Sequence, residues 1–297
     1  MHKYRWLYVL MIPALVYLFI NNYMPLGGLI IAFKRVNFRV GVWKSPWAGW
    51  ENFRYLFATK DAWIITRNTI LYNLAFIIIG LIVSVALAIG LAGMKNKKAR
   101  SFYQGSLLIP YIISYVVVSY LVYAFLGTNG LLNKSILPSL GIAPKNWYLT
   151  SKWWPFILIF VNTWKNAGYA TVIYMATILG FDDSLYEAAE LDGASKWQQI
   201  RYITLPQLKP TMITLTMLNI GRIFYSDFGL FYQVPQNSGA ILNVTNVIDT
   251  YVYRGLLQLG DISMSSAAGL YQAVVGFVII LGANLLVRKF SPEDALF

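Results

Sequence analysis

Long apolar stretches alternate with short polar segments along this chain. Each stretch holds the roughly 20 residues that a helix needs to cross the hydrocarbon core of a bilayer. The apolar residues run on continuously and do not alternate with polar ones as in the strands of a membrane barrel, so the pattern predicts helices. The six predicted membrane spans cover approximately residues 6–33, 67–94, 102–126, 153–180, 208–232 and 265–288.

Composition agrees with a membrane protein. Hydrophobic residues make up 58% of the 297 positions and charged residues only 12%, about half the charged share of a soluble domain. The first apolar run follows Lys3 and Arg5 and continues past Asn21 to Phe33 without a small-residue cleavage site, so we expect an uncleaved span. We therefore predict an all-α membrane protein with six transmembrane helices and a single transmembrane domain over residues 1–297.

The net charge of +12 is spread along the chain, and it forms no basic face of the kind that binds nucleic acid. We expect membrane lipid, and no nucleic acid, as the surroundings of this protein. One tight basic cluster, Lys95, Lys97, Lys98 and Arg100, lies between the second and third spans. Such clusters remain on the cytoplasmic side of a membrane. This orientation places both termini and the loop 181–207 in the cytoplasm.

Two further patterns concern packing and anchoring. The first external loop is rich in Trp and Phe over residues 43–57, which predicts a helix at headgroup level; a peptide-binding or sugar-stacking surface is the alternative. Gly80, Ser84 and Ala88 recur every four positions in the second span, which predicts close helix packing.

The loop 182–210 is longer than a simple connector between two spans needs to be. Ser184 followed by Glu187 has the spacing of a capping box and predicts the start of a short helix. Gly193 offers the backbone freedom for a tight turn after it. Ser195 followed by Gln198 predicts a second capped helix, which we expect Pro206 to end.

The same loop resembles the EAA loop of ABC-importer permeases, whose pattern is Glu-Ala-Ala, three residues, Gly, nine residues, Ile, one residue and Leu-Pro. All fixed positions are met, by Glu187, Ala188, Ala189, Gly193, Ile203, Leu205 and Pro206. The resemblance implies a type I ABC-importer permease fold. It also implies that this loop is the cytoplasmic coupling helix, which docks on the ATP-binding subunit and transmits its closure to the membrane helices.

Softer matches extend over the whole chain and are similar to permeases for maltose and complex polysaccharides. They lie at residues 11–13, 31–34, 45–47, 51–53 and 247–254. The resemblance implies a permease for oligosaccharides in the bacterial cytoplasmic membrane. The implied partners are a second homologous permease, two ATP-binding subunits and an external sugar-binding protein, which we expect to be lipid-anchored.

We expect this chain to hold no cofactor and to be no enzyme. A phosphate-binding loop requires a Gly-Lys pair, and the sequence contains none. ATP and Mg²⁺ are therefore expected on the partner ATPase. A membrane enzyme is disfavoured because His2 is the sole histidine and no nucleophile with a base is evident.

Polar residues inside spans usually face a cavity or a partner. One helical face of the fourth span carries Asn162, Lys165, Asn166 and Tyr169; the fifth carries Asn219, Arg222, Tyr225 and Ser226, with Asp227 adjacent. Positions similar to four of these line the transport site of maltose-type permeases, so the resemblance implies a substrate pathway here. Helix packing, or pairing of Arg222 with Asp227, is the alternative. The two basic residues hint weakly at an acidic sugar.

Two other kinds of transporter remain possible from the residues alone. An ion-coupled secondary sugar transporter would use an intramembrane acid, for which Asp227 is the one candidate. An ABC importer for a non-sugar solute would share the coupling loop. Tyr111, Ser114 and Tyr115 in the third span form part of a gate or pack against neighbouring helices.

Overall fold

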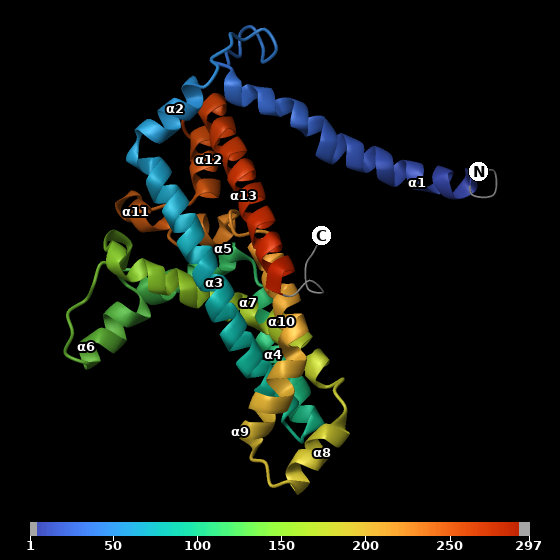
Figure 1. Ribbon diagram of the computed structural model, residues 1–297. Coiled ribbons are helices and arrows are strands. Elements are labelled where there is room, and N and C mark those ends of the chain that lie inside the picture. Colours follow the sequence, from blue (N-terminus) through green and yellow to red (C-terminus); the bar gives the residue numbers. More distant parts are fainter. Residues whose placement is uncertain (1–4, 291–297) are drawn as a thin grey trace. The chain divides into compact units, whose positions relative to one another are not determined.

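The computed structural model describes residues 5–290, and every regular element in this range is helical (Figure 1). This confirms the predicted all-α class. The α-helices are α1 (Arg5–Leu18), α2 (Glu51–Ala58), α3 (Lys60–Ala92), α4 (Lys97–Ile112), α5 (Tyr115–Leu126), α6 (Leu137–Ser139), α7 (Trp154–Ile178), α8 (Asp183–Leu191), α9 (Lys196–Gln199), α10 (Leu205–Ile220), α11 (Leu242–Thr245), α12 (Ile248–Leu257) and α13 (Ile262–Phe290).

Within the described range, three helical segments are long and apolar enough to cross a bilayer: Tyr8–Phe33, Lys60–Ala92 and Ile262–Lys289. The pair α4 and α5 adds a fourth if it is one span, but its two halves are bent by 96°. α7 has 25 residues, and its polar residues make it less apolar than these. Six spans therefore remain a prediction.

The predicted fifth span differs most from expectation. α10 ends at Ile220, and a turn follows before a π-helical segment at Gly229–Gln233. A continuous helix over 208–232 was therefore the wrong expectation. Hydropathy reports how apolar a segment is, and it does not report whether the backbone stays helical throughout.

By their internal contacts the residues divide into two compact units. The smaller comprises residues 5–63 with Tyr251–Ala273, and the larger comprises Ile64–Thr250 with residues 274–290. The prediction of a single transmembrane domain is not tested by this division.

In the smaller unit, three of the sequence stretches that carry the family resemblance fold onto one another. The Phe33 ring stacks on Trp47 and contacts Phe53, with distances between ring centroids of 5.8 and 5.3 Å. The Asn52 amide donates hydrogen bonds to the carbonyls of Ala32 and Lys34, at 2.8 and 3.0 Å. The aromatic loop thus contains a real helix, α2, as predicted. Trp47 and four other large aromatic side chains of residues 43–57 remain exposed.

The larger unit contains two buried apolar clusters. One gathers around Trp154, Leu158 and Val161 of α7 and includes Tyr72 of α3. The other lies further along the same two helices, around Ala88 and Tyr174. Apolar residues of several helices are thereby removed from the surroundings together.

Hydrogen bonds link α3 to α7 at Ser84, one of the small residues at which close helix packing is predicted. The Ser84 hydroxyl donates to the carbonyl of Ala167 at 3.1 Å, and Thr171 donates to the carbonyl of Ser84 at 3.4 Å. Ser84 and Ala88 are buried, which confirms their predicted packing role. Gly80 differs, because a β-carbon there would meet no atom within 4 Å.

Candidate functional site

The loop between α7 and α10 forms a helical elbow, defined here as residues 181–207. α8 begins where the Asp182 carboxylate accepts a hydrogen bond from the backbone N–H of Ser184 at 3.0 Å. This bond holds the pKa of Asp182 below its ordinary value. The predicted capping box of Ser184 and Glu187 is wrong, because an aspartate two residues earlier provides the cap.

Gly193 makes the turn of the elbow, as predicted. Its φ of +78° lies in the left-handed region that favours glycine. The N–H of Ala194 donates to the carbonyl of Ala189 at 2.9 Å, and that of Gly193 donates to Glu190 at 3.1 Å. These two bonds form a Schellman motif, which closes the C-terminus of α8.

α9 starts with the predicted capping box. The Ser195 hydroxyl accepts from the N–H of Gln198, and the Gln198 side chain accepts from the N–H of Ser195 at 2.7 Å. The helix does not end at Pro206. A π-helical segment, Ile200–Thr204, joins α9 to α10 without a break, and Pro206 lies in the first turn of α10. Proline is tolerated there because a first-turn N–H needs no helical partner.

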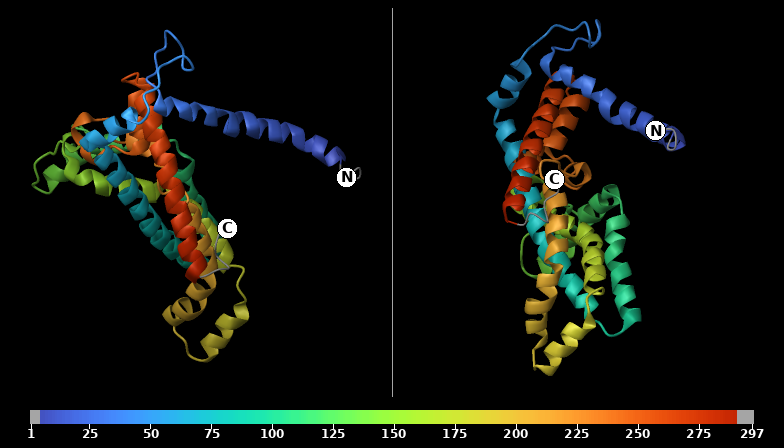
Figure 2. Two further views of the ribbon diagram at one scale, coloured as in Figure 1. Left: turned by 45° about the horizontal axis from the view of Figure 1, so that its top comes forward. Right: turned by 45° about the vertical axis from the view of Figure 1, so that its right-hand side comes forward.

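The elbow is tied together internally but leaves apolar side chains exposed. The Tyr186 hydroxyl is 3.0 Å from the Thr204 hydroxyl, which connects α8 to the π-helical segment. Leu191 is 90% exposed, and Trp197 and Tyr202 are 65% and 68% exposed. The elbow lies at one end of the larger unit (Figure 2). These three side chains are therefore accessible to another protein.

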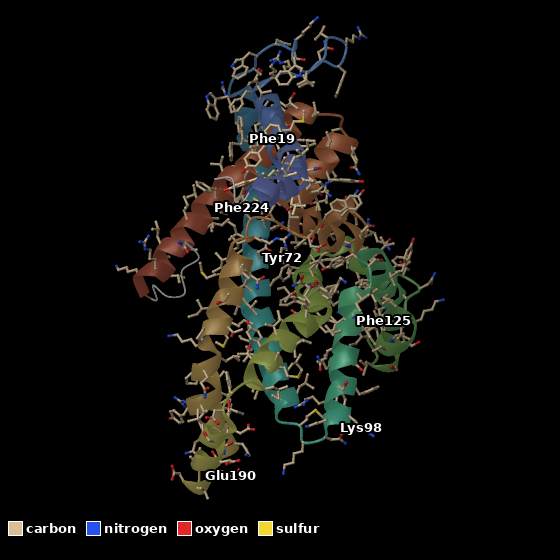
Figure 3. The ribbon with its side chains drawn as sticks, turned by 90° about the vertical axis from the view of Figure 1, so that its right-hand side faces the viewer. Phe19, Tyr72, Lys98, Phe125, Glu190 and Phe224 are labelled. Atoms are coloured by element: carbon tan, nitrogen blue, oxygen red, sulfur yellow. The ribbon has the colours of Figure 1, made fainter. Side chains whose placement is uncertain are left out.

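The structure places the predicted coupling residues around this elbow. Glu187, Ala188 and Ala189 lie on α8, Gly193 lies at the turn, and Ile203, Leu205 and Pro206 lie where the π-helical segment meets α10. Lys98 at the start of α4 lies toward the same end of the unit as Glu190 (Figure 3). The basic cluster and the elbow therefore occupy the same end of the larger unit.

The polar face of α7 is built around Lys165, which is buried. Its ammonium donates hydrogen bonds to the carbonyls of Pro110 and Tyr111, at 3.0 and 2.9 Å, and also to that of Ile113. The ring of Tyr115 lies 4.9 Å from the same nitrogen. All three N–H groups of Lys165 thus have carbonyl partners.

Of the other three residues of that face, Asn162 and Asn166 bond to each other within α7, and Tyr169 lies partly at the surface. The Asn166 amide donates to the carbonyl and the side-chain oxygen of Asn162, at 3.0 and 2.9 Å. Tyr169 is about half exposed and stacks on Tyr111 with a centroid distance of 5.0 Å.

The predicted residues of the fifth span lie at the end of α10 and in the turn after it. Asn219, Arg222 and Tyr225 are all exposed. The carbonyl of Tyr225 accepts from the amide of Asn73 in α3 at 3.2 Å. No ion pair joins Arg222 to Asp227 within the described range.

Sequence reasoning missed two residues that shape this region. A β-carbon on Gly168 would lie 2.0 Å from the carbonyl oxygen of Leu107, so only glycine permits this approach of α7 to α4. Gly229 lies similarly against the ring of Tyr115. For Gly168, the available sequence signal was its position three residues after the intramembrane Lys165.

Known proteins include relatives that are similar to this chain over nearly its full length. The chain is 31% identical to Protein LplB of Bacillus subtilis over 290 residues, which are 97% of this chain and 90% of that protein. It is 32% identical to the polygalacturonan/rhamnogalacturonan transport system permease protein YteP of the same species, over 97% of this chain and 89% of that one.

A solved structure is also similar over nearly the full length. It is a bacterial ABC transporter involved in the import of the acidic polysaccharide alginate. The TM-score is 0.89 at 30% identity, and the match covers 98% of this chain and 97% of that chain. Residues 80–292 match the family model described as binding-protein-dependent transport system inner membrane component. The chain therefore belongs to the family of inner-membrane components of binding-protein-dependent transport systems.

Proposed function

We propose that this chain is the permease subunit of an ATP-driven importer that carries oligosaccharides across the bacterial inner membrane. The elbow is the observation that carries the proposal. It is an ordered pair of short helices, closed at Gly193, which exposes Leu191, Trp197 and Tyr202. These features suit docking to a separate ATP-binding subunit. Closure of the ATP-binding subunit would move α8 and α9 and, through them, α7 and α10.

The proposed assembly contains a second permease of similar fold, two ATP-binding subunits that hold ATP and Mg²⁺, and an external, lipid-anchored sugar-binding protein. One similar structure, at 30% identity, is an alginate transporter in complex with an alginate pentasaccharide-bound periplasmic protein. The family description also specifies dependence on a binding protein. The elbow, the basic cluster at 95–100 and both termini are proposed to be cytoplasmic; the termini lie outside the described residues.

The sugar assignment is supported by the relatives. They include permeases of polygalacturonan, lactose and galactooligosaccharide transport systems. The family makes the ion-coupled secondary transporter less favourable than the ATP-driven importer, and the relatives make a non-sugar solute less favourable than an oligosaccharide.

We assign the substrate pathway to the exposed polar groups of two regions. Tyr169 on α7 offers a ring that can stack on a sugar face, and Asn219, Arg222 and Tyr225 offer hydrogen-bonding groups near the end of α10. Asn162 and Asn166 also contribute to this face, although each already has a partner on α7. Lys165 is left out of this pathway because its ammonium already donates to three backbone carbonyls.

A glycine substitution tests the coupling role. In the reconstituted complex, Gly193→Val should reduce sugar-stimulated ATPase activity by about tenfold, because a β-branched residue is strained at φ of +78°. Gly141→Val is the matched control. Gly141 has a φ of +70° with open space around it, and it lies outside the elbow.

Equal activity of the two variants would contradict the coupling role. The substrate is tested separately, by measuring binding of neutral and acidic oligosaccharides to the partner binding protein. An importer with no sugar-stimulated ATPase for any of them would contradict the sugar assignment.

A further inference from the structure

The break between α4 and α5 has an unusual stabilising group. α4 ends at Ile112, and the last four carbonyls of a helix have no partners within it. Two of these, at Pro110 and Tyr111, accept hydrogen bonds from Lys165, and so does the carbonyl of Ile113 beyond the helix end. A buried cation at a helix C-terminus also interacts favourably with the helix dipole.

The start of α5 contacts the same lysine. Ser114 caps α5 through its hydroxyl, which accepts from the N–H of Val117 at 3.4 Å. The ring of Tyr115, the first residue of α5, has its centroid 4.9 Å from the ammonium nitrogen of Lys165. Lys165 of α7 thus contacts both sides of the break, through the carbonyls at the end of α4 and the ring at the start of α5.

The packing that brings Lys165 to these carbonyls depends on Gly168, one turn further along α7. A β-carbon there would lie 2.0 Å from the Leu107 oxygen. The two backbones therefore approach closely just before the end of α4, which lets a lysine side chain reach the carbonyls of the following turn.

We propose that Lys165 is a positioning residue that holds the 96° bend between α4 and α5, and that its charge stabilises this bend and does not recognise the charge of the sugar. The inference rests on the proposed function. α7 ends at Ile178, five residues before α8 begins. A displacement of the elbow is thereby transmitted along α7 to the bend, and Lys165 passes it on to both halves of the bent span.

Substitution of Lys165 distinguishes the two roles. Lys165→Met in the reconstituted complex should lower transport of neutral and acidic oligosaccharides alike, by about tenfold, because buried carbonyls lose their donors. Lys165→Gln is neutral but keeps two donors, and it should restore part of the transport of both. Lys152→Met, an exposed lysine before α7, is the matched control and should remain within about twofold of wild type.

A distance measurement separates positioning from simple stabilisation. Spin labels at Phe102 and Tyr120, both exposed on α4 and α5, report the bend directly, because the chain has no native cysteine. In the wild-type complex the distance should change when ATP is added. In Lys165→Met it should be broadly distributed and should not respond to ATP, even if the complex assembles normally.

Three results would overturn the inference. They are loss of acidic-sugar transport alone in Lys165→Met, no rescue by Lys165→Gln, and an ATP-dependent distance that is unchanged in Lys165→Met. Failure of the proposed function has a different signature: the wild-type complex would then show no sugar-stimulated ATPase activity, whereas the distance measurement needs no sugar.

Discussion

Single residues decide how closely the helices of the larger unit approach and how the elbow begins. Gly168 and Gly193 illustrate two separate uses of glycine. Gly168 is required because of a neighbouring backbone, and Gly193 because of its own φ of +78°. Their substitutions should therefore fail for different reasons, the first in stability and the second in coupling.

Gly168→Ala should destabilise the protein, because the added β-carbon overlaps the Leu107 carbonyl and the helices must separate. Overpacking of this kind costs roughly 1–3 kcal/mol. The measurement is the melting temperature of the purified complex in detergent. Gly105→Ala in α4 is the control, because a β-carbon there meets no atom within 4 Å and alanine favours helix. A Gly168→Ala melting temperature equal to that of the control would contradict the close approach.

The cap of α8 should make the start of the elbow sensitive to acid. The folded pKa of Asp182 is lowered by the hydrogen bond from Ser184, so its stabilising effect is present above the unfolded value of about 3.9 and is lost as pH falls through the folded pKa. Amide exchange in the first turn of α8 should therefore accelerate, relative to the rest of the chain, only in acid. In Asp182→Ala the exchange should be fast at every pH; a variant that retains the wild-type profile would show that another group provides the cap.

Among the helices of the elbow, the junction of α9 and α10 sets the direction in which α9 points. The π-helical segment Ile200–Thr204 keeps the chain helical from α9 into α10. A π turn contains one residue more than an α turn, so it sets the direction in which α9 and the exposed Trp197 point. The rotation of α9 about the axis of α10 thus depends on one extra residue in the π turn.

Insertion of one alanine after Arg201, which is exposed in this segment, should rotate α9 by about 100° relative to α10, because the π turn already contains its one extra residue. Binding of the ATP-binding subunit should fall by about tenfold, while membrane insertion is retained. Co-purification of the two subunits measures the effect. Insertion of one alanine after Ala143, exposed in the segment before α7, is the control. Equal co-purification of both insertion variants would mean that the register is unimportant.

At the scale of the whole molecule, the sidedness of the elbow decides the transport proposal. Glu190→Cys in the elbow should react with a membrane-impermeant thiol reagent only after the cells are opened, whereas Ala143→Cys should react in intact cells. Because the chain contains no native cysteine, each label reports a single position. Labelling of Glu190→Cys in intact cells would place the elbow outside and would contradict coupling to a cytoplasmic ATPase.

The helical class, the apolar segments and the turn of the elbow follow from the amino-acid sequence alone. These features are local: apolar length follows from composition, and Gly193 and the Ser195–Gln198 box act through bonds within a few residues. Two local predictions are wrong: Asp182 caps α8 in place of Ser184, and Pro206 lies in the first turn of α10 and does not end a helix.

The surroundings of the polar residues in the spans depend on how the helices pack in three dimensions. Helical spacing placed Lys165 on the same face as Tyr169, but the two have different surroundings: one is buried among carbonyls of another helix, and the other is half exposed. The sequence analysis also did not predict the bend between α4 and α5, although Pro110 lies just before it. The physical reason is that a buried charge is satisfied by groups distant along the chain, and these are brought near only by the packing of α7 against α4.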